Sequence, residues 1–201
     1  MTELHRKTPV QERSKQTIET ILDAATQVLQ VEGEERFTTN RVAEKSGFSI
    51  GTLYQYFPNK NAIVEALAER ERIAIEATVA KAISEADPHE IEDVIRTVVR
   101  TAINAFGRRR KLRKFVIIQM IRLNLAPIVL KSMDKIGISV VKAIEARGKG
   151  RVRPLSEAAS FVLTRAIVGA IRSAVLEDRL ILDSQDFEDE LVRLALRFLL
   201  P

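Results

Sequence analysis

Apolar residues recur every three or four positions along most of this chain, the spacing of one face of an α-helix. The first such stretch covers residues 14–31, with Ile18, Ile21, Leu22, Ala25, Val28 and Leu29. Alternation with a period of two is scarce, so no strand is predicted. We expect an all-α fold of about nine helices, at residues 14–31, 39–46, 49–57, 59–85, 87–106, 111–124, 127–147, 155–177 and 184–200.

Residues that start or stop helices support these boundaries. Gly33 is a natural stop for the first helix because glycine readily adopts the left-handed conformation. One threonine of the Thr38-Thr39 pair can cap the second helix, and Ser49 and Asn59 can cap the third and fourth, since their side-chain oxygens accept free backbone N–H groups. The chain divides at these signals into a small N-terminal domain, residues 1–58, and a larger one, residues 59–201.

Residues 38–60 form the pattern of a helix-turn-helix. Two short helices are joined at Gly47, which permits a positive φ. Val42 and Ala43 are predicted to face inward, and Leu53 and Phe57, four positions apart, to pack the third helix onto the first. This arrangement is typical of a module that places its second helix in the major groove of DNA.

The outward residues of this segment suit contact with DNA. Hydroxyls, helix N-termini and lysines commonly bind phosphates, while amides and arginines read base edges. A glycine in the reading helix allows close approach to the groove. The predicted DNA-binding residues are Thr38, Thr39, Asn40, Arg41, Ser49, Gly51, Thr52, Tyr54, Gln55, Tyr56 and Lys60.

The segment resembles the N-terminal domain of the TetR family of bacterial regulators over about the first third of the chain. The matching residues, at fixed spacing without a gap, are Thr38-Thr39, Val42-Ala43, Gly47, Ser49, Gly51-Thr52-Leu53-Tyr54, Tyr56-Phe57 and Asn59-Lys60. The length and the helix layout also agree with that family. The resemblance implies that Thr39, Tyr56 and Lys60 hold phosphates. It also implies that Thr52, Tyr54 and Gln55 lie near bases, with Asn40 and Arg41 at the groove edge.

The same resemblance implies a cytoplasmic, ligand-responsive regulator, a repressor that binds a palindromic DNA operator as a homodimer and is released by a small, largely apolar molecule. The last two helices would form the dimer contact, because apolar and small residues occupy more than one face of the eighth helix. A ligand cavity would lie among the middle helices. The residues predicted to line it are polar ones within apolar runs: Thr101, Asn104, Gln119, Arg122, Asn124, Thr164 and Arg165.

Charge alone is a poor guide to the partner of this chain. The net charge of +5 suggests a nucleic acid, but residues 1–60 hold 8 Lys and Arg against 8 Asp and Glu. The excess therefore lies outside the predicted DNA-binding domain. Two basic clusters, residues 108–114 and 147–153, are interpreted as solvated helix ends and loops, with contact to a ligand or to DNA as the alternative.

Other classes of protein lack support in the sequence. The chain has no Cys and only two His, with no glycine-rich phosphate loop or metal-binding spacing, so we predict no enzyme, cofactor or metal site. The near-neutral first 60 residues disfavour a nonspecific architectural DNA binder. No secretory signal is evident at the N-terminus, and the richest apolar stretch, 115–125, is too short and too polar for a membrane span.

Overall fold

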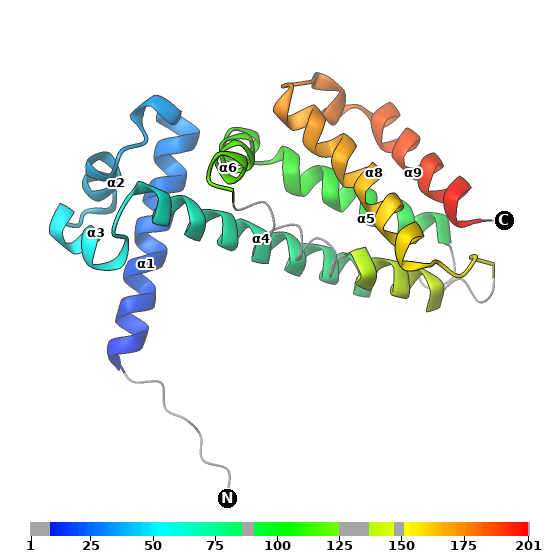
Figure 1. Ribbon diagram of the computed structural model, residues 1–201, viewed down its shortest axis with the longest axis horizontal. Helices are drawn as coiled ribbons and strands as arrows, with labels where there is room; N and C mark the ends of the chain where they lie inside the picture. Colours follow the sequence, from blue (N-terminus) through cyan, green and yellow to red (C-terminus); the bar gives the residue numbers. More distant parts are fainter. Residues whose placement is uncertain (1–8, 86–90, 125–136, 147–150, 201) are drawn as a thin grey trace, which may run out of the picture. The chain divides into compact units, whose positions relative to one another are not determined.

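The computed structural model describes residues 9–85, 91–124, 137–146 and 151–200 (Figure 1). Every regular element in these ranges is helical, which confirms the predicted all-α class. The longer elements are α1 (Pro9–Gln27), α2 (Thr39–Ser46), α3 (Ile50–Tyr56), α4 (Lys60–Glu85), α5 (Ile91–Gly107), α6 (Arg110–Arg122), α8 (Glu157–Leu176) and α9 (Gln185–Leu199), with a further helical stretch at 137–146. A π-helical turn (Val28–Glu32) and two 3-10 turns (Glu34–Arg36 and Leu180–Asp183) complete them.

Three predicted features lie partly outside the described residues. They are the start of the fifth helix at 87–88, the first half of the seventh, and residues 147–150 of the loop before α8. The chain forms two compact units, Met1–Ala68 and Glu69–Pro201, which divide within α4. The predicted boundary at 58/59 lies just before that helix, so the structural division comes later in the chain than the one expected from sequence.

In the first unit, local hydrogen bonds fix the helix starts where the sequence suggested. Thr38, Ser49 and Asn59 each accept the backbone N–H three residues further on, at 3.2, 3.0 and 3.0 Å. The cap of α2 is therefore the first threonine of the pair. Gly47 has φ 76°, a left-handed conformation that a side chain would strain, and it ends α2 so that the chain can turn into α3.

A small apolar core holds the first unit together. Leu53 and Phe57 are 0% and 5% exposed, so the predicted packing side of α3 is buried. Complete burial of a leucine contributes roughly 1.5–3 kcal/mol, enough for a few such residues to fix a short helix. The largest fully buried side chains of this unit are Phe37, Ile21, Leu53, Ile63, Leu67, Val28, Val42 and Val64.

The second unit has its own core, built where α5, α8 and α9 lie side by side (Figure 1). Its most deeply buried members are Val94, Ile171, Val175, Leu182, Val192 and Leu199. Ser184 caps α9 by accepting the N–H of Phe187 at 3.2 Å, as its place before an acidic first turn predicts.

Helix α8 is more apolar than the sequence analysis recognised. Over an 18-residue window its mean hydropathy is 1.5, long and apolar enough to cross a membrane by length and composition alone. Arg165 and Arg172 interrupt the helix, so it contains no long uncharged run. Core helices of folded domains meet the same test, and α8 does contribute Leu163 and Ile171 to the core. Yet only 22% of the window is buried, so most of this apolar helix lies uncovered.

Candidate nucleic-acid interface

Helices α2 and α3, joined through Gly47, form the predicted helix-turn-helix (Figure 1). A contact of 3.3 Å between the hydroxyls of Thr39 on α2 and Tyr54 on α3 links the two helices on their outer side. Tyr54 is 47% exposed although it is a large aromatic residue, and the neighbouring Gln55 is exposed as well. The arrangement presents hydroxyl and amide groups from two helices on one polar surface.

None of the eleven predicted DNA-binding residues is buried. Seven are exposed: Thr38, Asn40, Ser49, Gly51, Tyr54, Gln55 and Lys60. Four are half-buried: Thr39, Arg41, Thr52 and Tyr56. The placement agrees with a contact surface, and the individual contacts to DNA remain predictions.

Two of these residues already have a structural task. Thr38 and Ser49 cap α2 and α3, so each hydroxyl accepts one backbone N–H. The hydroxyls of Ser49 and Thr52 also lie 2.9 Å apart. These bonds satisfy free N–H groups in the first turn of each short helix and so keep the helix ends from fraying.

Arg41 is held by carboxylates of its own unit. Its Nε and Nη2 donate to the two oxygens of Glu32 at 2.7 and 2.8 Å, and its Nη1 lies 2.7 Å from Glu44. The hydrogen bonds from Arg41 lower the pKa of Glu32 below its usual range, and those carboxylates raise the pKa of Arg41. Arg41 was expected at the groove edge, and neither carboxylate partner was predicted from the sequence.

Lys60 begins α4 beside the same surface. Its Nζ lies 5.2 Å from the centre of the ring of Phe37, which is 1% exposed. A cation over an aromatic face is weakly attracted to it, so the ring steadies the lysine while its charge stays in solvent.

Residues 21–67 match the family model of the bacterial regulatory proteins of the tetR family. The match contains α2, α3 and every predicted contact residue. The first unit therefore carries the DNA-binding domain of the TetR family. This is a family of DNA-binding transcriptional regulators, and the helix-turn-helix is its N-terminal module.

Sequence relatives match part of the chain. The nucleoid occlusion factor SlmA of Glaesserella parasuis is 34% identical over 98 residues, 48% of this chain and 45% of that protein. The uncharacterised HTH-type transcriptional regulator YvdT of Bacillus subtilis is 39% identical over 51 residues, 25% of this chain and 26% of that protein. The chain thus spans less than half the length of the curated relatives it matches.

Solved TetR-family structures share the fold over nearly the whole chain. A TetR-family transcriptional regulator from Mesorhizobium loti has a TM-score of 0.72 at 19% identity, covering 94% of this chain and 99% of that one. The fatty acid degradation regulator FadR from Bacillus halodurans has a TM-score of 0.62 at 19% identity, covering 87% and 97%. At these identities the likeness concerns the fold alone.

The predicted ligand residues do not come together in the cavity formed by described residues of the second unit. That cavity, of about 470 Å³, is lined by Thr101 and by Ala82, Glu85, Asp93, Arg96, Thr97 and Arg100. Its lining is mostly polar and charged, unlike the apolar pocket expected. Of the other predicted residues, Asn104, Arg122 and Asn124 are exposed, whereas Gln119, Thr164 and Arg165 are half-buried. All seven stay predictions as ligand contacts.

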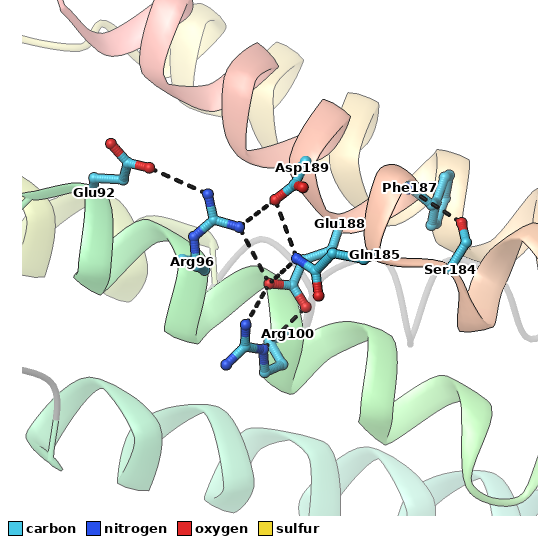
Figure 2. Close-up of polar contacts among 8 residues, drawn as sticks. All are labelled: Glu92, Arg96, Arg100, Ser184, Gln185, Phe187, Glu188 and Asp189. Carbon is cyan, nitrogen blue, oxygen red and sulfur yellow. Dashed lines mark hydrogen bonds and ion pairs between the residues drawn. The ribbon is translucent and has the colours of Figure 1, made fainter.

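An arginine–carboxylate network fixes α9 against α5 (Figure 2). Arg100 donates to both oxygens of Glu188 at 3.0 and 2.8 Å, and Arg96 pairs with Glu188 and Asp189. Gln185 adds a hydrogen bond to Asp189 at 3.1 Å. Hydrogen bonding to these cations and to Gln185 lowers the pKa of both carboxyls. No local pattern revealed this network, because its partners are about ninety residues apart.

Four of the six basic residues in the cluster at 108–114 form ion pairs within the second unit. These ion pairs join Arg109 and Arg113 to Glu71, Arg110 to Asp183, and Lys114 to Asp178. Of the second cluster, residues 147 and 149 lie outside the described ranges. Its Arg153 donates to the carbonyl of Phe198 at 2.7 Å and lies over that ring. The structure therefore favours the interpretation of the cluster at 108–114 as a helix end and loop, and of the second cluster it fixes only the contacts of Arg153.

Proposed function

We propose that this protein is a ligand-responsive, sequence-specific transcriptional repressor that binds a palindromic operator as a homodimer. Its predicted setting is the cytoplasm, with no catalytic role. The observation that carries the proposal is the polar surface of α2 and α3, where Tyr54 and Gln55 are exposed and Thr39 and Tyr54 are joined. An exposed tyrosine and glutamine on a short, firmly capped helix fit a reading helix in a major groove.

The residues of this surface divide into two proposed roles. Thr39, Tyr56 and Lys60 contact phosphates, which sets the position of the module on the duplex without reading sequence. Tyr54 and Gln55, with Thr52, lie near base edges and select the operator. Gly51 supports this arrangement because it leaves room beside the reading helix near its N-terminus.

Dimerisation is proposed to use α8 and α9. A single reading helix contacts few base pairs, so such modules work in pairs on symmetric half-sites. Large apolar side chains are exposed on both helices, among them Phe161 and Val162 at 53% and Leu194 at 43%. An exposed apolar patch of this kind is typical of a protein interface, and a second copy of the chain is the proposed occupant.

The second unit is the proposed sensor. A small, largely apolar effector would shift the spacing of the two reading modules if it prefers one of two arrangements of the dimer. The polar cavity beside Thr101 suits such a molecule poorly. The effector site is therefore proposed among the apolar faces of the middle helices, near Gln119, Thr164 and Arg165.

Selection of duplexes from a random pool, followed by affinity measurements at one fixed salt concentration, tests the proposal. We expect a palindromic sequence to be enriched and to bind at least about 10³-fold more tightly than random DNA. Equal affinity for both would instead indicate an architectural DNA binder. Sedimentation at micromolar concentration should give the mass of a dimer, and a monomer would contradict the dimer proposal.

A further inference from the structure

We infer that Arg41 is a positioning residue for the reading module and not a ligand of DNA. The inference rests on the proposed DNA-binding function and revises one residue of it. Arg41 belongs to the first turn of α2, beside Thr39 and Asn40, where a phosphate-binding arginine would be expected. Its side chain instead points to Glu32, in the turn that ends α1.

The guanidinium of Arg41 has no nitrogen left uncommitted. Nε and Nη2 form a two-pronged pair with Glu32 at 2.7 and 2.8 Å, and Nη1 lies 2.7 Å from Glu44. The Glu32 side chain is only 17% exposed and that of Arg41 33%. The two carboxylates occupy three of the five N–H groups of Arg41 and neutralise its charge, so it is a weaker candidate for a phosphate contact than the exposed Lys60.

The place of Arg41 in its helix also argues for a positioning role. The N-terminus of a helix carries a partial positive charge, so a cation in the first turn is unfavourable there. Two carboxylates offset that repulsion at Arg41. The Glu32–Arg41 pair also spans the turn at Gly33, whose φ of 88° lets the chain reverse between α1 and α2. Joining the two sides of that turn fixes the direction in which α2 begins.

What the pair orients is the contact surface itself. Thr38 caps α2 through the backbone N–H of Arg41, so the cap and the ion pair meet at one residue. Thr39 and Asn40 occupy the same turn, and Thr39 touches Tyr54 on α3. A tilt of this turn would move these groups together. If loss of the pair lowers the DNA-competent fraction to about a tenth, the apparent Kd rises about tenfold.

Glu32→Gln gives the sharpest test because the two roles predict opposite signs. If Arg41 binds phosphate, Glu32→Gln releases the guanidinium and removes a negative charge that competes with phosphate. Binding to DNA should then tighten. If Arg41 is a positioning residue, Glu32→Gln should weaken operator binding about tenfold, and Arg41→Met should weaken it to the same extent. Glu35→Gln, at an exposed acid in the neighbouring 3-10 turn, is the matched control and should leave affinity nearly unchanged.

Salt dependence supplies a readout that a stability change alone would not move. Each phosphate contact contributes about 0.9 to the slope of log K against log salt concentration. We expect the Arg41→Met and Arg41→Lys slopes to equal that of the wild type while affinity falls in both. Lysine keeps the charge but lacks the two-pronged geometry, so Arg41→Lys also serves if Glu32→Gln does not fold.

The probe is a duplex that the wild-type protein selects from a random pool, with thermal unfolding measured for each variant. A smaller salt slope for Arg41→Met, or tighter binding by Glu32→Gln, would overturn the inference. Recovery of affinity in the exchanged variant Glu32→Arg/Arg41→Glu would support it further. Failure of the wild type to select any duplex would refute the proposed function instead, so the two failures are distinguishable.

Discussion

The two units of this protein use their charged residues in different ways. In the first unit, the surface of α2 and α3 offers exposed hydroxyl and amide groups, with Lys60 at its edge. In the second unit, arginines are concentrated but most of those near α5 and α6 are bound to carboxylates, as around Glu188 (Figure 2). The more basic unit therefore has fewer cations available for a partner than its sequence suggests.

This difference shows why net charge is a weak indicator of nucleic-acid binding. A run such as residues 108–114 looks like a phosphate site in the sequence, yet its partners Glu71, Asp178 and Asp183 come from distant parts of the chain. An interface for DNA needs groups that remain accessible once the fold is complete. On the surface of α2 and α3 that condition is met mainly by uncharged polar groups, with Lys60 as an exposed cation.

The largest expected effect concerns the buried charges of the second unit. Glu71 is 3% exposed and lies 2.6 Å from Arg113, itself 8% exposed, whose pKa burial lowers. Glu71→Gln leaves that cation buried without a counter-charge, so we expect a loss of about 3–5 kcal/mol in the free energy of unfolding. Urea denaturation measures it. Glu69→Gln, at a half-exposed acid paired with Arg72, should cost less than about 1 kcal/mol.

A double substitution separates the charge from the packing at this site. Glu71→Leu together with Arg113→Leu removes both charges, and we expect it to recover most of the lost stability. If the double variant is as unstable as Glu71→Gln, the arginine is needed for more than neutralisation. Neutralisation by a carboxylate would then not be the main role of the buried Glu71–Arg113 pair.

The next largest effect concerns the apolar surface of α8. Val162→Asp places a charge on an exposed apolar position, where it would cost little in a monomer and much in a dimer contact. We expect a monomeric mass in sedimentation and a loss of about 10²-fold in operator affinity, because the two half-sites no longer bind together. Ile73→Asp is the matched control, since this branched aliphatic residue of α4 is 51% exposed and lies outside the proposed dimer helices. A dimer with full affinity in Val162→Asp would show that another surface pairs the chains.

Much of the fold could be predicted because it depends on residues close in sequence. The caps at Thr38, Ser49 and Asn59 each need a partner only three positions away. The burial of Leu53 and Phe57 follows from their spacing on one helix face. Such features are set by local geometry, which a sequence pattern records directly.

The features that were missed join distant residues. Glu32 and Arg41 meet across the turn at Gly33, and no helical or strand period relates residues nine apart on the two sides of a turn. The Arg100–Glu188 pair spans 88 positions. Such contacts depend on how the helices pack. The sequence could therefore predict which residue types lie on the DNA-binding surface, but not which of their side chains are already bound to carboxylates.

A smaller effect should separate reading from positioning within the first unit. Gln55 is exposed on α3 and is proposed to lie near bases, whereas the half-buried Tyr56 is proposed to hold a phosphate. Gln55→Ala should change which operator is preferred, at a cost of about 1–3 kcal/mol for the original sequence. Tyr56→Phe should weaken binding to operator and random DNA alike. Affinities measured for both duplexes at one salt concentration decide the matter, and the same pattern from both variants would defeat the division.

The smallest expected effect is the acid sensitivity of the network between α5 and α9. The hydrogen bonds from Arg100 lower the pKa of Glu188, although burial opposes them. A carboxyl whose pKa is lower in the folded state stabilises that state above its unfolded pKa, about 4.3, and loses the contribution as pH falls through the folded value. Unfolding free energies measured from pH 6 downwards should therefore fall less steeply in Glu188→Gln than in the wild type. Glu190→Gln, on the same helix but paired within it to Arg193, should keep the wild-type slope. If Glu188→Gln also keeps it, the network does not contribute to acid sensitivity, and the second unit's ion pairs matter for packing rather than for charge.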